Sequence, residues 1–101
     1  MTRTVQQLFN LEGKTALVTG GSRGLGLQLA QALGEAGAKI MLSSRKAGDL
    51  EEAAAELQAA GIDARWIAAD ASKEEDIRRL ADETLQRMGH VDILVDRKSV
   101  V

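Results

Sequence analysis

The sequence predicts an α/β fold, a doubly wound parallel sheet of which the first four strands are present. Short apolar runs alternate with longer segments in which apolar residues recur every three or four positions. Each longer segment closes on a glycine, a common helix terminator. Strands that alternate with helices in this way pair in parallel through right-handed crossovers.

The four strands are predicted from short runs of aliphatic and β-branched residues bounded by turn residues. Each run is too short for a typical helix and suits a strand buried inside a sheet. They are TALVT (15–19), AKIMLSS (38–44), ARWIAAD (64–70) and VDILV (91–95).

The first helix is predicted from Gly24 to a stop at Gly37. Leu25, Leu29 and Leu33 recur every four residues in this segment, with Ala30 and Ala36 beside them. They therefore predict the helix face that packs on the sheet.

The second and third helices are predicted from their caps. Asp49 is expected to cap the second helix, which Gly61 ends. Ser72 and Glu75 form a Ser-x-x-Glu capping box for the third, which Gly89 ends. Its apolar stripe is Ile77, Leu80, Ala81, Thr84, Leu85 and Met88.

Composition narrows the function classes. With 101 residues the chain is one domain at most, and its net charge of −2 gives no reason to expect nucleic acid or an anionic membrane as a partner. No cysteine is present, which excludes disulfides and thiolate metal sites, and no metal site is expected. No apolar run approaches a membrane span, and the N-terminus lacks the apolar core of a signal peptide, so the cytoplasm is the predicted location.

The loop VTGGSRGLG at 18–26 follows the first strand and opens the first helix. Such a loop directs backbone N–H groups and the positive helix end at one point, which makes an anion site, most often for phosphate. A P-loop is excluded because no Lys-Ser/Thr follows the last glycine, and the Gly-Lys-Thr at 13–15 precedes the strand. The standard Gly-x-Gly-x-x-Gly spacing also fails. The pattern present is Thr-Gly-x-x-x-Gly-x-Gly, at Thr19, Gly20, Gly24 and Gly26.

This pattern resembles that of the short-chain dehydrogenase/reductase family. Further features occur in the family's order: EGKTALVTGGSRGLG, then SSR ending the second strand, AAD ending the third, and VDILV. The resemblance covers residues 12 to about 95 and implies a Rossmann-type sheet. It also implies that this chain is the N-terminal, cofactor-binding half of an NAD(P)-dependent oxidoreductase.

The resemblance implies a set of cofactor-binding residues, position by position. The three motif glycines would line the pyrophosphate, and Thr19 would brace the turn by side-chain hydrogen bonding. An aspartate at the end of the third strand would lie beside the adenine. The implied residues are Thr19, Gly20, Ser22, Arg23, Gly24, Leu25, Gly26, Arg45, Asp70 and Ala71.

The end of the second strand favours NADP(H) over NAD(H). An acidic residue there would bind the ribose 2′-hydroxyl and repel a 2′-phosphate. Arg45 and Lys46 stand there instead, and Arg23 is placed to help from the glycine turn. NAD(H) stays open, because two cations at a strand end can also be merely solvated.

The reaction of the family needs a serine, a tyrosine and a lysine that match no position here. The chain contains no tyrosine, so we expect it to be inactive alone. The resemblance implies a homo-oligomeric parent enzyme that interconverts an alcohol and a ketone on a small molecule. A sugar acid such as gluconate and a 3-oxoacyl thioester are the substrate types that such sequences resemble most.

The chain divides into an N-terminal lead-in (1–13), a partial nucleotide-binding domain (14–95) and a tail (96–101). The tail DRKSVV stands where the family has Asn-Asn-Ala-Gly. It equals the translation of GAT-CGG-AAG-AGC-GTC-GTG, the start of a common sequencing adapter, so we expect it to be non-native. A frameshift or a genuine short product is the alternative.

Two other interpretations of the whole chain stay open. The first is a non-catalytic module that binds NADP(H). The second is a methyl transferase, which would require an acidic residue where Ser43, Ser44 and Arg45 stand.

Three further residues are expected to have no part in catalysis. His90 is expected at the surface, Trp66 in packing, and Asp92 in a structural role. With the fourth strand at an uncovered apolar edge, we expect marginal stability and a tendency to aggregate.

Overall fold

The computed structural model describes residues 10–20, 24–70 and 72–96. Four strands alternate with three helices along this part of the chain. The elements are β1 (Thr15–Thr19), α2 (Gly24–Glu35), β2 (Lys39–Ser44), α3 (Ala47–Ala59), β3 (Ala64–Ala68), α4 (Glu74–Met88) and β4 (Ile93–Asp96).

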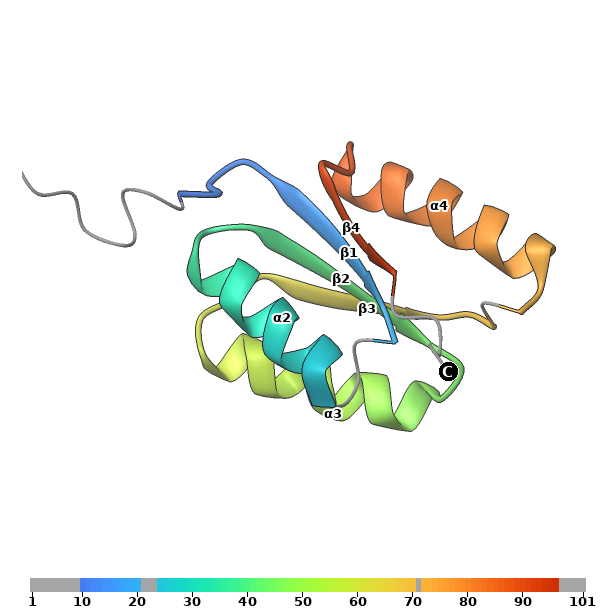
Figure 1. The fold of residues 1–101 in the computed structure, drawn as a ribbon, viewed down its shortest axis with the longest axis horizontal. Coiled ribbons are helices and arrows are strands. Elements are labelled where there is room, and N and C mark those ends of the chain that lie inside the picture. Colours follow the sequence, from blue (N-terminus) through green and yellow to red (C-terminus); the bar gives the residue numbers. More distant parts are fainter. Residues whose placement is uncertain (1–9, 21–23, 71, 97–101) are drawn as a thin grey trace, which may run out of the picture.

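The strands form one parallel sheet in the order β3-β2-β1-β4. The chain runs outward from β1 to β3 and then returns to the other side of β1. Because right-handed crossovers in opposite directions place their helices on opposite faces, α2 and α3 cover one face and α4 covers the other (Figure 1). The predicted Rossmann-type α/β fold is confirmed.

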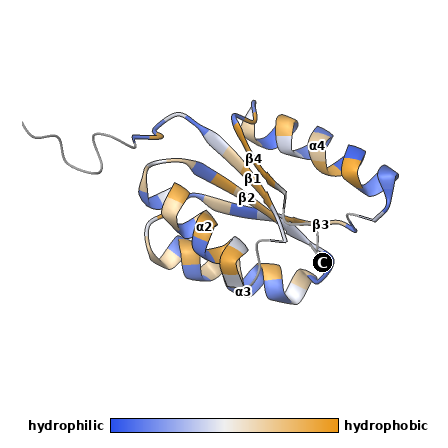
Figure 2. Ribbon diagram, in the orientation of Figure 1, coloured by the Kyte–Doolittle hydropathy of each residue, from blue (hydrophilic) through white to orange (hydrophobic). Residues whose placement is uncertain are grey.

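Two apolar cores lie on the two faces of the sheet. The larger lies under α2 and α3 and the smaller lies under α4. Trp66 packs at the margin of the larger core, in agreement with its predicted packing role. Figure 2 shows apolar residues concentrated in the strands, whereas α4 is hydrophilic along much of its length. The larger core contains Ala16, Val18, Ile40, Leu42, Leu50 and Leu57, and the smaller contains Leu17, Met41, Ile67 and Leu80.

The predicted face of α2 is correct in part. Ala30 is buried and Leu33 packs against the larger core, whereas Leu25 is 51% exposed and Gly26, outside the predicted face, is buried.

Small residues allow α2 to pack closely on its surroundings. A Cβ added at Gly34, one turn after Ala30, would meet Cγ2 of Ile62 in the turn between α3 and β3 at 2.5 Å. Close packing at Gly26, Ala30 and Gly34 therefore contributes to the orientation of α2, in addition to the leucine repeat.

The start of α3 also differs from the prediction. The helix begins at Ala47 with Lys46 at the N-cap, and no side chain caps it. The first helical hydrogen bond runs from Leu50 N to Lys46 O (3.1 Å), which places Asp49 inside the first turn. Asp49 is thus not the cap, although a carboxylate in the first turn is still favoured by the helix dipole.

The predicted capping box of α4 is wrong as well. The helix begins at Glu74 with Lys73 at the N-cap, and no side chain of a capping box bonds there. Ser72 instead bonds back to Asp70. Strand β3 ends at Ala68, two residues before the predicted end.

Asp92 ties the start of β4 to β1, which agrees with its expected structural role. Its carboxylate accepts a hydrogen bond from Thr15 N (2.9 Å), and its own N–H donates to Thr15 O (2.9 Å). His90, exposed as predicted, places Nδ1 2.5 Å from the same carboxylate. The Thr15 N–H holds the pKa of Asp92 below its ordinary 3.8, His90 adds to this, and desolvation opposes it.

The Asp92 contact predicts an acid-sensitive contribution to stability. A carboxyl whose pKa is lower in the folded state stabilises the fold above its unfolded pKa, and this stability is lost as the pH falls through the folded value. Asp92→Asn should therefore lose less stability than the wild type below about pH 4. Urea unfolding across a pH series checks this, with the exposed Asp82→Asn as control. Equal acid sensitivity of Asp92→Asn and the wild type would contradict it.

Strand β4 lies at the edge of the sheet in the described part of the chain. Leu94 pairs in register with Leu17, and so lies on the α4 face of the sheet, yet it is 64% exposed. On α4 itself, Ile77 and Leu85 are 41% and 48% exposed. Apolar side chains are therefore exposed both on β4 and on α4.

The exposed edge predicts self-association, because an apolar edge strand offers unpaired backbone groups to another chain. Leu94→Lys should shift the chain towards monomer. Light scattering after size-exclusion chromatography measures this. Ala55→Lys, which adds the same charge at an exposed position of α3, is the control and should leave the association unchanged. A wild type that is monomeric at high concentration would refute the prediction.

Candidate cofactor site

The glycine turn begins where β1 ends. Gly20 adopts a φ of 67°, and its N–H donates to Ser43 O on β2 (2.6 Å). Gly24 adopts a φ of 57° at the first residue of α2. Both angles lie in the left-handed region that favours glycine. The backbone at Gly20 and Gly24, on either side of the turn, therefore has a conformation that requires glycine.

Thr19 links β1 to β4 at the end of the sheet where the glycine turn begins. Its hydroxyl donates to Val95 O on β4 (3.3 Å), and in the sheet register Thr19 pairs with Asp96. The side chain thus fastens β1 to β4 at this end.

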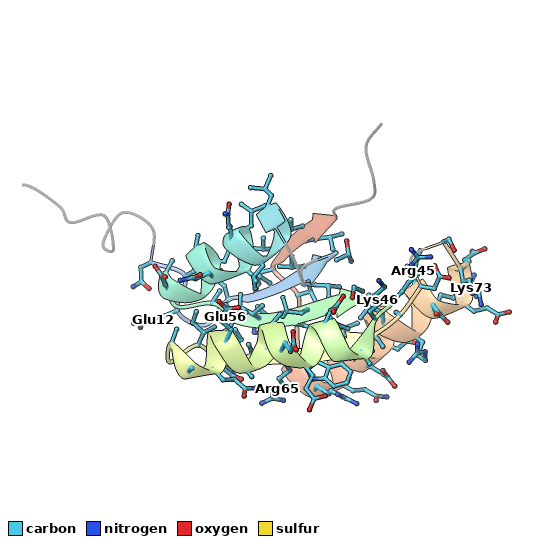
Figure 3. All side chains as sticks on the ribbon, turned by 90° about the horizontal axis from the view of Figure 1, so that it is seen from below. Glu12, Arg45, Lys46, Glu56, Arg65 and Lys73 are labelled. Carbon is cyan, nitrogen blue, oxygen red and sulfur yellow. The ribbon has the colours of Figure 1, made fainter. Side chains whose placement is uncertain are left out.

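The carboxyl ends of β2 and β3 lie beside each other. Ala69 N donates to Ser44 O (2.8 Å), so the residues that follow, Asp70 and Arg45, are neighbours at this edge of the sheet. Figure 3 shows Arg45, Lys46 and Lys73 at the same end of the molecule, near the starts of α3 and α4. Ligands of open α/β sheets bind outside the carboxyl ends of the strands, which is where these charged residues gather.

Asp70 is the acidic group of this edge and is partly buried. Its Oδ1 accepts from the Ser72 hydroxyl (2.6 Å) and from Ser72 N (2.9 Å). These two hydrogen bonds hold the pKa of Asp70 below its ordinary 3.8, and Arg45 and Lys73 lower it further by their charge, while desolvation opposes the shift. At neutral pH Asp70 is therefore an ionised hydrogen-bond acceptor.

The turn between β3 and α4 is fixed by a second set of hydrogen bonds. Asp76 Oδ2 accepts from Asp70 N (2.8 Å), and Lys73 N donates to Asp70 O (3.0 Å). Arg79 donates to Ala68 O (2.9 Å) and lies 3.9 Å from the Asp76 carboxylate. The backbone on both sides of the Asp70 side chain is therefore held by α4.

The structure brings most of the sequence-predicted residues to this edge. Thr19, Gly20 and Gly24 lie at the end of β1 and the start of α2, where Leu25 is exposed and Gly26 is buried. Three other predicted residues, Ser22, Arg23 and Ala71, lie outside the described residues.

Sequence reasoning missed the residues that hold Asp70. The pattern Ser72-x-x-Glu75 predicts a helix cap and gives Asp76 no part in the site, whereas both Ser72 and Asp76 bond to Asp70. The Asp-x-Ser spacing at 70–72 is the signal that could have identified the turn, because aspartate often accepts a hydrogen bond from the N–H two residues ahead.

A sequence profile described as short chain dehydrogenase matches residues 14–99. This chain belongs to the short-chain dehydrogenase family. The match includes every strand and helix described above. No helix in the described part of the chain combines the length and apolar character that crossing a membrane requires.

Similar short-chain dehydrogenases are found among curated proteins and solved structures. The Pseudomonas aeruginosa rhamnolipids biosynthesis 3-oxoacyl-[acyl-carrier-protein] reductase is 46% identical over 88 residues, which cover 87% of this chain and 34% of that protein. The Pseudomonas aeruginosa RhlG/NADP active-site complex has a TM-score of 0.84 at 42% identity, over 91% of this chain and 37% of that one. The 2-keto-3-deoxy-D-gluconate dehydrogenase of Streptococcus agalactiae has a TM-score of 0.86 at 34% identity, over 97% and 38%. This chain therefore spans about a third of the length of its relatives.

Proposed function

We propose that this chain is the cofactor-binding half of a short-chain oxidoreductase that uses NADP(H) in preference to NAD(H). The observation that carries the preference is the charge at the carboxyl end of β2. Arg45 and Lys46 follow that strand, both are exposed, and neither has an ion-pair partner in the described part of the chain. An unpaired guanidinium can form two parallel hydrogen bonds to a phosphate.

We propose that different residues contact each part of the dinucleotide. Arg45 would hold the 2′-phosphate, and the Asp70 carboxylate would accept from the adenine amine. The glycine turn, with Gly20, Gly24 and Gly26 and with Ser22 and Arg23 between them, would bind the pyrophosphate against the start of α2. Thr19, Leu25 and Ala71 would flank these groups. When bound, the nicotinamide supplies the hydride chemistry, and the residues of this chain hold and orient the dinucleotide.

For the complete enzyme we propose interconversion of an alcohol and a ketone on a small molecule, in a homo-oligomer in the cytoplasm. Two relatives support the substrate types, since one is a 3-oxoacyl-[acyl-carrier-protein] reductase and another a 2-keto-3-deoxy-D-gluconate dehydrogenase. The name of a third, an NADP complex, supports the cofactor. A 3-oxoacyl thioester and a sugar acid both contain the ketone or alcohol that such a reaction requires.

The 101 residues alone should bind the dinucleotide without turning over a substrate. They include no tyrosine to serve as the proton donor of the family reaction. In isolation the chain would therefore behave as a nucleotide-binding module, the alternative that the sequence left open.

Fluorescence of Trp66, the only tryptophan, tests the proposal. It lies on β3, the strand that leads to Asp70. Titration with NADPH should change its emission in a saturable way, whereas S-adenosylmethionine should not. Saturable binding of S-adenosylmethionine with none of NADPH would favour a methyl transferase and overturn the proposal.

A further inference from the structure

The side chain of Asp70 is held in one orientation by a single residue. Both donors of Ser72, its hydroxyl (2.6 Å) and its N–H (2.9 Å), bond to the same oxygen, Oδ1. A carboxylate has about four acceptor positions on two oxygens. Oδ2 of Asp70 accepts no hydrogen bond in the described part of the chain. One oxygen is therefore occupied and the other is available.

The backbone that carries Asp70 is fixed independently of Ser72. Asp76 accepts from Asp70 N, and Lys73 N donates to Asp70 O. The remaining freedom is rotation of the carboxylate, and Ser72 limits it through its hydroxyl and, at a longer distance, through its N–H. In the described residues this hydroxyl has no other hydrogen bond, so its effect acts on Asp70 alone.

We propose that Ser72 is a positioning residue for adenine recognition, and that it keeps Oδ2 of Asp70 aimed at the exocyclic amine of the ring. The inference rests on the proposed function. An adenine amine donates hydrogen bonds, whereas hypoxanthine has a carbonyl oxygen at that position, which a carboxylate repels. A correctly oriented Asp70 therefore selects adenine, and a freely rotating one selects it less.

Selectivity between two dinucleotides tests this role. The Kd of NADPH is compared with that of reduced nicotinamide hypoxanthine dinucleotide phosphate, in which a carbonyl oxygen replaces the exocyclic amine and the adjacent ring nitrogen carries a hydrogen. The wild type should prefer NADPH by about tenfold, and Ser72→Ala should reduce this to about twofold. Ser72→Thr, which keeps a hydroxyl, should retain the preference. Gln31→Ala removes an exposed side-chain hydrogen bond of 2.9 Å on α2 and should retain it too.

The ratio of the two Kd values separates this role from general stability, because both are measured on one preparation and a loss of folded protein affects them equally. An unchanged ratio in Ser72→Ala, or a lost preference in Ser72→Thr, would overturn the inference and leave the proposed function intact. A wild type without a preference for adenine would also overturn it. A wild type that binds neither dinucleotide would overturn the proposed function itself.

Discussion

Gly34→Ala should destabilise the fold by about 1–3 kcal/mol, although alanine is the better helix former. The added Cβ would lie 2.5 Å from Cγ2 and 2.9 Å from Cγ1 and Cδ1 of Ile62. Ile62 is buried, and its Cγ2 sits on a β-branched carbon that cannot rotate away freely. α2, or the turn between α3 and β3 that carries Ile62, would have to shift to make room. Thermal unfolding measures this as a drop of about 4–8 °C for each kcal/mol.

Gly48→Ala is the matched control for this prediction. Gly48 lies in the first turn of α3, and a Cβ there meets nothing within 4 Å. The same substitution should therefore stabilise the chain by up to about 1 kcal/mol. Combining Gly34→Ala with Ile62→Ala should cost less than the two single changes together, because the contact is then gone. A Gly34→Ala variant as stable as the wild type would show that α2 is not closely packed.

Arg45→Asp should weaken NADPH binding by about tenfold to a hundredfold and leave NADH binding unchanged or slightly stronger. The change removes a charge-assisted bond to the 2′-phosphate and places a like charge beside it. An aspartate at the end of this strand can instead bind the ribose 2′-hydroxyl of NADH. Isothermal titration of each dinucleotide gives both affinities.

Lys39→Asp is the control for this prediction, because it makes the same change of charge on β2, the strand that Arg45 follows. Lys39 is the exposed first residue of β2, at the opposite end from Arg45. Any effect of net charge alone should appear in both variants, whereas loss of a phosphate contact should appear only in Arg45→Asp. Equal weakening of NADPH and NADH by Arg45→Asp would mean that Arg45 does not distinguish them.

The fold followed from local patterns because its two central strands, β1 and β2, are buried on both faces. β1 is apolar over most of its length and has the predicted bounds. A short apolar run between helical segments is typical of a strand that is buried inside a parallel sheet. The orientation of α2 followed only in part. Ala30 and Leu33 of the predicted face pack on the larger core, but Leu25 is exposed and Gly26 is buried. Which face packs depends on how closely β-sheet and helix approach, a property that hydropathy does not encode.

The site could be predicted where the backbone conformation itself requires a particular residue type. The glycines at 20 and 24 have the positive φ that their spacing indicates. The setting of Asp70 was not predictable, because its N–H donates to Asp76, six residues further on, and no local sequence pattern links these two residues. Ser72 could act as a helix cap or as a partner of Asp70, and only the folded turn distinguishes these.

The most direct test of the proposed cofactor preference is to titrate the wild-type chain with NADPH and with NADH at low and high salt. If Arg45 and its neighbours recognise the 2′-phosphate, NADPH binds at least about tenfold more tightly at low salt, and the gap narrows as salt screens the charges. Equal affinities at both salt concentrations, or tighter binding of NADH, would contradict that preference.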